Sequence, residues 1–370
     1  MKKSLLKTVL ASLAIFFAIS FAASAKIVIV DNYKFVGQYK SLDDAVGYSS
    51  AGDTIYLTGS PNLYVIQNNY NMSNRTIIGV GYNPQTPSAY SSTIVANNMV
   101  TRYSSNFTFE GIKFVCMDYQ YCLWQAIDHV KFNRCCFSGG KQFFSYAGVQ
   151  SNNLEFTNCI FDNCILSGGN RDGGYYFTFN SIISNNIFWY SEITNFSGSQ
   201  IYNNVFIGEN NSSTLSYING SQIYNNIFYG TSTSDFSNIT TCDFKSNLKP
   251  GSVDLPPSGD GNSAENNQNL GTGTSDFTNI VTSSTSWSTA NDFHLTTGSA
   301  GKKAGNDVHD MGIFGGQFHF PEFADGTTDY TGEPAELPVF RAFNILNDGD
   351  MFPTVGTGGQ VQFQVRAIKK

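Results

Sequence analysis

The octapeptide SQIYNNVF at residues 199–206 returns as SQIYNNIF at residues 221–228, a step of 22 residues. A period of 20 to 50 residues is typical of solenoids, in which each repeat is one unit stacked on the last. The same spacing, a large apolar residue followed five positions later by Phe, extends through the middle of the chain. The pairs are Phe109/Phe114, Phe132/Phe137, Phe156/Phe161, Ile183/Phe188, Ile201/Phe206, Ile223/Phe228 and Ile239/Phe244.

The spacing of five predicts a bend inside each repeat. In a straight strand, residues an odd number apart face opposite sides, so both members of a pair reach one core only if the chain turns between them. Asn lies at that point, as in Asn203-Asn204 and Asn225-Asn226, and Asn tolerates the left-handed backbone region. Each repeat is therefore expected to be one coil of a parallel β-helix, with Asn side chains stacked as amide ladders at its corners.

Proline distribution favours this β-helix over the alternative, a β-sandwich with accidental internal similarity. No proline occurs between Pro87 and Pro250, the part of the chain in which every strand must donate hydrogen bonds to a neighbour.

The cysteines are expected to belong to the repeat. There are seven, so at least one stays unpaired within the chain. In this register Cys135, Cys159 and Cys242 take the ladder position of the asparagines. Directly stacked parallel positions suit a disulfide poorly, so buried free thiols are favoured over a Cys135–Cys159 bridge. Two further pairings stay open: Cys116–Cys122 and Cys159–Cys164. With four histidines and no Cys-x-x-Cys pair, we expect no metal site and no cofactor.

The first residues indicate export. Three lysines among the first seven residues precede an apolar stretch from Val9 to Phe21, and Ala23-Ser24-Ala25 is a small-x-small cleavage motif. This pattern is typical of a secretory signal peptide, residues 1–25, rather than of an anchor helix, and it places the mature protein outside the cytoplasm, in the periplasm, at the cell surface or in the medium. No later stretch is apolar for about 18 residues, so no transmembrane segment is expected in the mature chain.

Composition excludes other classes of protein. Charged residues are 13% and aromatic residues 15% of the 370 residues, the opposite of a disordered chain. The formal net charge is −7, and loss of the three leader lysines takes it to −10 (−7 minus 3). A nucleic-acid partner is therefore not expected.

The two ends carry a family resemblance. The runs SLDDAV (residues 41–46), AGDTIYL (51–57) and RTIIGVGYNP (75–84) resemble the N-terminal cap and first coil of secreted bacterial right-handed parallel β-helix proteins of the pectin-lyase-like superfamily. The run DFHLTTGSAGKKAGNDVHDMGIFGG (292–316) is similar to their closing coil. The resemblance covers roughly residues 26–316 and implies right-handed coiling and enzymes that cleave acidic polysaccharides.

This reading divides the chain as follows. Residues 1–25 are the signal peptide, 26–60 the N-terminal cap and first strand, 61–316 the β-helix and 317–370 a C-terminal β extension. Within the β-helix, 250–273 is a loop excursion and 292–316 the closing coil. In the extension, 340–346 and 359–367 are expected to be strands.

No catalytic residue is assigned. Ala126-Ile127-Asp128-His129 superficially resembles the Trp-Ile-Asp-His run of pectate lyases, but the calcium ligands and arginine motif of that family are not recognisable. Lys113 and Arg134 lie one coil apart yet occupy different ladders. Asp307, His309 and Asp310 are more consistent with a turn than with a cation site. Whether the protein is an enzyme stays open, with the residues favouring a non-catalytic protein.

Outward aromatic residues suggest a binding face instead. In this register Tyr202 and Tyr224 stack outside the core, with Gln200 and Gln222 in the neighbouring ladder and with the loop aromatics Trp124 and Trp189 next in line. Rings beside amides suit sugar faces and hydroxyls. The leading hypothesis is an exported, non-catalytic protein that binds a polysaccharide, a cell-surface glycan or another surface. The alternatives are a polysaccharide lyase or glycoside hydrolase acting on an acidic polysaccharide, and a structural spacer of the cell envelope.

Overall fold

The computed structural model describes residues 25–333 apart from short gaps. The gaps are 67–70, 84–89, 96–100, 103, 116–123, 126, 140–141, 144–149, 170–176, 209–213, 260, 272–275, 282–285, 317–318 and 324, together with the side chains of 101–102, 124–125 and 142–143. The expected signal peptide up to residue 24, the pair Cys116–Cys122 and the expected strands 340–346 and 359–367 lie outside the described residues.

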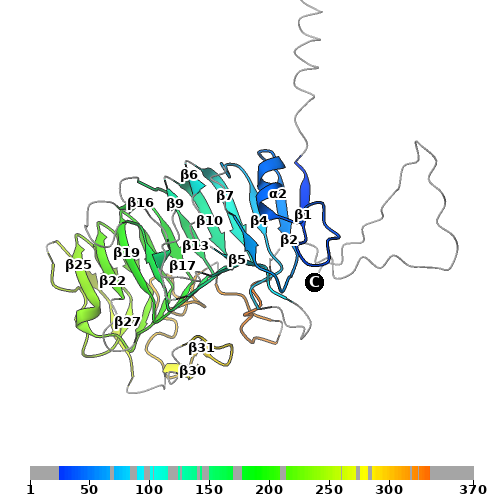
Figure 1. The fold of residues 1–370 in the computed structure, drawn as a ribbon. Coiled ribbons are helices and arrows are strands. Elements are labelled where there is room, and N and C mark those ends of the chain that lie inside the picture. The colour runs from blue at the N-terminus through cyan, green and yellow to red at the C-terminus, as the bar shows by residue number, and fades with distance from the viewer. Residues whose placement is uncertain are drawn as a thin grey trace, which may run out of the picture.

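The described chain winds into a parallel β-helix, as the 22-residue repeat predicted, and its coiling is right-handed, as the family resemblance implied (Figure 1). Three parallel sheets run along its axis. Sheet 1 contains β1 (Ile27–Val30), β2 (Thr54–Leu57), β4 (Thr76–Ile78), β7 (Ser105–Glu110), β10 (Asp128–Asn133), β13 (Glu155–Thr157), β17 (Ile182–Ser184), β20 (Gln200–Tyr202), β23 (Gln222–Tyr224), β26 (Asp243–Lys245) and β28 (Ser263–Glu265).

Sheet 2 follows sheet 1 in each coil, and sheet 3 completes the coils in the middle of the solenoid. Sheet 2 contains β3 (Tyr64–Val65), β5 (Thr93–Val95), β8 (Lys113–Val115), β11 (Cys136–Ser138), β14 (Ile160–Asp162), β18 (Ile187–Trp189), β21 (Val205–Ile207), β24 (Ile227–Tyr229), β27 (Leu248–Lys249) and β29 (Gln268–Asn269). Sheet 3 contains β12 (Gln142–Phe143), β15 (Ile165–Ser167), β16 (Thr178–Phe179), β19 (Glu192–Ser197), β22 (Leu215–Asn219) and β25 (Phe236–Thr240), preceded by the 3-10 turn η1 (Thr233–Asp235). A separate pair joins β6 (Thr101–Arg102) to β9 (Trp124–Gln125).

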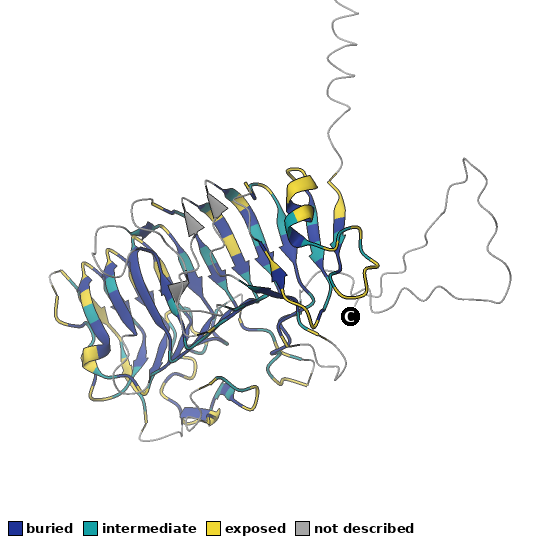
Figure 2. Ribbon diagram, in the orientation of Figure 1, coloured by how far each residue is buried: buried dark blue, intermediate teal, exposed yellow. Residues whose placement is uncertain are grey.

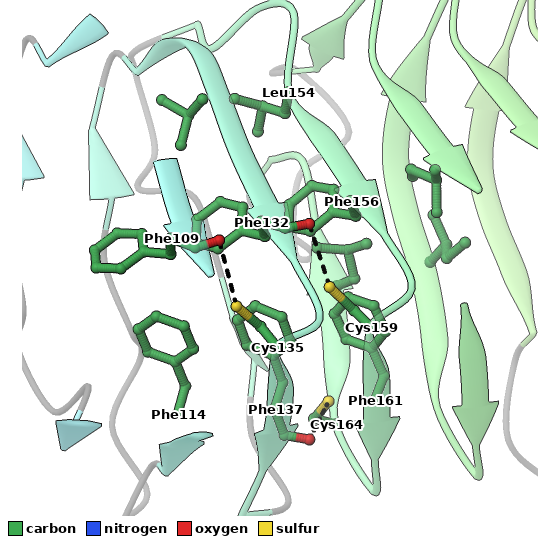
Figure 3. Close-up of a cluster of buried hydrophobic side chains, with 14 of the residues drawn as sticks. Phe109, Phe114, Phe132, Cys135, Phe137, Leu154, Phe156, Cys159, Phe161 and Cys164 are labelled. Atoms are coloured by element: carbon green, nitrogen blue, oxygen red, sulfur yellow. Dashed lines mark hydrogen bonds between the residues drawn. The ribbon is translucent and has the colours of Figure 1, made fainter. Parts of the chain in front are cut away.

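The core consists of stacked rings and aliphatic side chains, each in register with its counterpart one coil away (Figure 3). In sheet 1, Phe109, Phe132 and Phe156 stack with ring centroids 5.5 and 5.0 Å apart. In sheet 2, the phenylalanines five positions later stack at 4.6 to 5.1 Å, with Phe161 between its two neighbours. These residues are fully buried or nearly so, as the spacing of five predicted.

The last predicted pair, Ile239/Phe244, was assigned to the wrong ladders. Phe244 pairs with Ile223 in sheet 1, whereas Ile239 lies in sheet 3 opposite Ile218. The spacing of five is coincidental here, because sheet 3 contributes apolar residues to the core with a similar period.

Asparagine makes the corner between sheets 1 and 2. Asn158, Asn185, Asn203 and Asn225 have φ between 54 and 56°, the left-handed conformation that Asn tolerates. The residue after each corner points inward, and these inward residues stack into a ladder along the axis. In the ladder, Oδ1 of each Asn accepts the backbone N–H of the ladder residue one coil earlier. The inward members are Asn186, Asn204, Asn226, Asn247 and Asn267.

Two cysteines occupy this ladder, as expected, and a third does not. The thiols of Cys135 and Cys159 donate to the carbonyls of Phe109 (3.6 Å) and Phe132 (3.3 Å), where an Asn amide donates in later coils. Cys242 instead continues a serine ladder, since its sulfur accepts the N–H of Ser221. The five described cysteines are buried and free, so neither Cys135–Cys159 nor Cys159–Cys164 is a disulfide.

The N-terminal end of the solenoid is covered by a short helix, α2 (Leu42–Tyr48). Ser41 caps it, and its Oγ accepts the N–H of Asp44. Leu42, Ala45 and Val46 pack onto the core, while the outer surface of α2 is exposed (Figure 2). No helix in the described part of the chain is long and apolar enough to cross a membrane.

The C-terminal part differs from the expected loop and closing coil. Within 250–273, β28 and β29 extend sheets 1 and 2 by one more coil. Residues 276–333, here called the C-terminal arm, do not stack on that coil. They begin with an antiparallel pair, β30 (Phe277–Asn279) and β31 (Asp292–Leu295), which lies beside the solenoid below sheet 2 in Figure 1.

The arm covers the outer face of sheet 2. Outward residues of sheet 2, including Ile187, Trp189 and Val205, form a second apolar cluster with Phe277, Phe293 and other arm residues. The middle strands of sheet 2, such as β18 and β21, are therefore buried on both faces, whereas sheet 1 keeps a polar outer face beside the arm.

Candidate functional site

Tyr202 and Tyr224 lie one above the other on the outer face of sheet 1. β20 and β23 pair in register, which sets Tyr202 opposite Tyr224 and Gln200 opposite Gln222. The two tyrosine rings are 4.8 Å apart at an interplanar angle of 3°, as the repeat predicted. Both tyrosines are half-buried and both glutamines are exposed. The Tyr224 hydroxyl donates to Oε1 of Gln200 at 3.3 Å, so the two predicted ladders are in contact.

The tyrosine pair lines a groove of about 550 Å³ between sheet 1 and the C-terminal arm. This volume lies within the range of small-molecule sites. The groove is lined by Asn185, Tyr202, Asn203, Gln222, Tyr224, Asp243, Lys245, Asn306, Asp307 and Gly316. We call it the tyrosine groove.

Two corner asparagines bind the C-terminal arm, which forms the wall of the groove opposite sheet 1. The side-chain amide of Asn185 donates to the carbonyls of Ile313 (3.0 Å) and Gly315 (2.9 Å). Asn225 and Asn306 exchange two hydrogen bonds: Nδ2 of Asn225 donates to Oδ1 of Asn306 at 2.8 Å, and the N–H of Asn306 donates to Oδ1 of Asn225 at 2.9 Å. The residues that turn the coil thus also hold the arm in place.

Asn203, between these two corners, differs from them. It is 2% exposed and belongs to the groove lining. Its Oδ1 is buried and has no hydrogen-bond partner among the described residues. A buried acceptor without a donor is costly, and Oδ1 of Asn158, at an earlier corner, is in the same position.

The groove is acidic. Asp243 and Asp307 bring two carboxylates, and the single lysine of the lining, Lys245, is paired with Glu265 at 2.7 Å. Burial raises the pKa of the Tyr224 phenol, and Tyr202 and the charge of Asp307 add to the rise. Tyr224 is therefore a neutral hydroxyl at physiological pH.

The two predicted tryptophans do not join this site. Trp189 is fully buried under the arm, so its proposed role as an exposed sugar platform was wrong. The sequence does not show which distant segment covers it. Trp124 lies in β9, and its side chain is outside the described part of the structure.

The weaker catalytic candidates have structural partners. The carboxylate of Asp128 accepts from Asn153 (2.8 Å) and lies 2.9 Å from Nδ1 of His129 at an exposed corner. Lys113 lies opposite Cys136 in sheet 2, away from Arg134, a corner residue with φ 52°. No group of three or more His, Cys, Asp or Glu residues in the described chain is arranged to hold a metal ion.

Asp310 likewise has local partners. It pairs with Lys302 at 2.6 Å and accepts the N–H of Lys303, as a turn residue would. Asp307, unlike Asp310, belongs to the lining of the tyrosine groove. The sequence analysis singled out Asp307 but missed its place beside the tyrosines, and it missed Asp243, Lys245 and Asn306 altogether. The serial order of residues contains no signal for this contact, which joins segments about 80 residues apart.

Comparison with known proteins gives similarity of fold. No protein-family model and no curated protein matches the chain. Among solved structures, a rhamnogalacturonan lyase aligns over 74% of this chain and 97% of its own, at 13% identity and a TM-score of 0.42. The pectate lyase Pel9A aligns over 80% of this chain and 97% of its own, at 14% identity and a TM-score of 0.34. A pectin methylesterase from carrot aligns over 67% and 84%, at 16% identity and a TM-score of 0.36. These similarities concern the β-helix architecture, and no functional residue is taken from them.

Proposed function

We propose that this protein is an exported, non-catalytic carbohydrate-binding protein and that the tyrosine groove is its binding site. The observation that carries the proposal is the parallel, stacked Tyr202–Tyr224 pair on the wall of a groove of about 550 Å³. Sugar rings present apolar C–H faces and a rim of hydroxyls, and aromatic rings beside polar side chains match both features.

The groove offers these polar groups close to the rings. Gln222 and Asn306 contribute side-chain amides to the lining, and Asp243 and Asp307 contribute carboxylates. The outward ladder that holds the two tyrosines continues as Ser184 on one side and Lys245 on the other, so a sugar chain running beside sheet 1 meets the aromatic pair in two adjacent coils.

The test is a binding screen of purified protein against a polysaccharide panel, with retention and product formation both measured. We expect the double variant Tyr202→Ala/Tyr224→Ala to lose binding while keeping the β-sheet circular dichroism of the parent. Tyr48→Ala is the matched control, because Tyr48 is an exposed tyrosine on α2 at the opposite end of the solenoid. Binding that survives the double change, or that is lost equally in the control, would place the site elsewhere.

Glycoside hydrolysis is the second candidate function, because Asp243 and Asp307 place two carboxylates on one groove. Hydrolysis needs such a pair, one as acid and one as base or nucleophile. The same screen separates the candidates: new reducing ends that disappear in Asp243→Asn or Asp307→Asn establish a hydrolase, and unsaturated products establish a lyase. Retention without either product supports a binding protein.

The proposed export has a testable consequence at the start of the described chain. The backbone N–H of Lys26 donates to Oδ1 of Asp53 at 2.8 Å. Cleavage after Ala25 would convert this amide into an α-ammonium group beside a carboxylate, which strengthens the contact. N-terminal sequencing of the secreted protein tests the cleavage. A mature chain starting at Lys26 should also melt at a higher temperature than one with an added Gly-Ser.

A further inference from the structure

The charge of the tyrosine groove bears on which glycan it accepts. Asp243 and Asp307 both belong to its lining. The ammonium group of Lys245 lies 2.7 Å from a carboxylate oxygen of Glu265, so its charge is already compensated. The local balance is therefore negative even when Lys245 is counted.

The remaining charged neighbour does not reverse this balance. Nδ1 of His309 lies 3.5 Å from Oδ2 of Asp307, and the backbone N–H of His309 donates to Oδ1 of Asp307 at 3.2 Å. The His309 ring is largely exposed, so solvent weakens its effect on the groove. Ser263 donates to Asp243 at 2.9 Å as a neutral hydroxyl.

The charged groups of the groove lining also favour ligands that donate hydrogen bonds. The carboxylates of Asp243 and Asp307 only accept hydrogen bonds when ionised. Oδ1 of Asn203, buried in the lining, is an acceptor without a described donor. The site is therefore rich in acceptors and attracts cations.

From the two carboxylates that line the groove beside the tyrosine pair, we propose that the groove selects glycans with protonated amines over glycans with carboxylates. This inference rests on the proposed function and names its ligand class, a polymer or oligomer of amino sugars. A uronate would bring its carboxylate toward two others, whereas a sugar ammonium donates to the same groups. Two unit charges about 4 Å apart in water interact strongly enough to change affinity about 5-fold.

The experiment compares three hexasaccharides of equal length by isothermal titration calorimetry at mildly acidic pH and low salt. They are the hexamers of glucosamine, N-acetylglucosamine and galacturonic acid. We expect the glucosamine hexamer to bind tightest and the galacturonate hexamer weakest. We also expect added salt to narrow the difference, because it screens exposed charges.

Variants connect this order to the named carboxylates. Asp243→Asn/Asp307→Asn should weaken glucosamine-hexamer binding at least about 5-fold while changing N-acetylglucosamine-hexamer binding less than about 2-fold. Asp254→Asn, which removes an exposed carboxylate outside the groove lining, should leave both unchanged.

Two results overturn the inference alone: galacturonate binding at least as tight as glucosamine binding, or a preference that the double variant leaves unchanged. Two other results would overturn both the inference and the proposed function. One is that none of the three hexamers binds at millimolar concentration, and the other is that Tyr202→Ala/Tyr224→Ala leaves their binding unchanged.

Discussion

Replacement of Asn204 by leucine should destabilise the protein by about 3 kcal/mol, because this residue makes four buried hydrogen bonds in the inner ladder. Its Nδ2 donates to the carbonyl of Ile183 (2.8 Å) and to Oδ1 of Asn226 (3.0 Å). Its Oδ1 accepts from the backbone N–H (2.9 Å) and from Nδ2 (3.0 Å) of Asn186. Asn204 is fully buried, and leucine has a similar size, so the change removes hydrogen bonds and leaves little cavity.

The size of this loss of stability depends on which hydrogen-bond partners of the Asn204 side chain would be left without another partner. The N–H of Asn186 would be left buried and unpaired, at a cost of about 1–3 kcal/mol. The carbonyl of Ile183 would lose a hydrogen bond, at about 0.5–1.5 kcal/mol. Nδ2 of Asn186 keeps the carbonyl of Phe156, and Oδ1 of Asn226 keeps the N–H of residue 204. The expected range is therefore about 1.5–4.5 kcal/mol.

Cysteine at position 204 should cost about half as much, because the ladder itself shows how a thiol fits. Cys159 occupies the same position two coils away and donates to the carbonyl of Phe132 at 3.3 Å. In the serine ladder, the sulfur of Cys242 accepts the N–H of Ser221 at 3.5 Å. A cysteine at position 204 can thus donate one hydrogen bond and accept one in place of the Asn204 amide, and both would be weaker than those of the amide.

The measurement is urea denaturation followed by circular dichroism, together with hydrogen exchange of the Asn186 amide, since a solenoid can open locally. Asn269→Leu is the control: Asn269 is exposed and accepts one hydrogen bond, from Lys249, so its loss should stay within about 0.5 kcal/mol. The reasoning is refuted if Asn204→Leu is as mild as this control, or if Asn204→Cys destabilises as much as Asn204→Leu.

Three further predictions concern the core, a thiol and the N-terminal cap. Phe161→Ala should cost about 3–5 kcal/mol in the same denaturation assay, because it removes a ring stacked between two others; a cost below 1 kcal/mol would contradict the stack. Burial raises the pKa of the Cys135 thiol well above its usual value, so iodoacetamide should label it only after denaturation, and rapid native labelling would contradict its burial. Hydrogen bonds from the backbone of Ser50 and then Lys26 lower the pKa of Asp53, so its contribution to stability is present at neutral pH and is lost as pH falls below about 4. Asp53→Asn should flatten that acid-side decline in the melting temperature, and an unchanged pH profile would refute the assignment.

The repeating part of the fold was predictable because each coil repeats the same local chemistry. Large apolar residues, a left-handed Asn and an inward Asn recur at fixed spacing, so the register could be read without tertiary information. The misassigned Ile239/Phe244 pair shows where that spacing is ambiguous. The ladder residue three positions later resolves it: Ile223 precedes Asn226 by three, and Phe244 precedes Asn247 by three.

Burial of Trp189 also had a local signal, which the sequence analysis did not use. Strands of sheet 1 alternate, as in Gln200–Tyr202, whereas β18 (Ile187–Trp189) and β21 (Val205–Ile207) are continuous apolar runs. Continuous runs indicate a strand buried on both faces, which implies a cover over sheet 2. The identity of that cover was not predictable, because the arm has no periodic relation to the coils.

The same asparagines explain why the groove lies where it does. A left-handed corner needs a residue such as Asn for its backbone, and at Asn185 and Asn225 the side chain is used again to bind the arm. The apolar contacts of the arm lie over sheet 2, and past the corner sheet 1 presents polar side chains such as Gln200 and Gln222. A groove therefore forms where the apolar cover stops and the outward tyrosines begin. Its position along the axis follows from the few coils whose corners carry Asn185, Asn203 and Asn225, and in the middle one the Asn keeps an acceptor with no described partner. The groove is thus a consequence of how the coil is turned, because the asparagines that turn the chain also line the groove or hold its opposite wall.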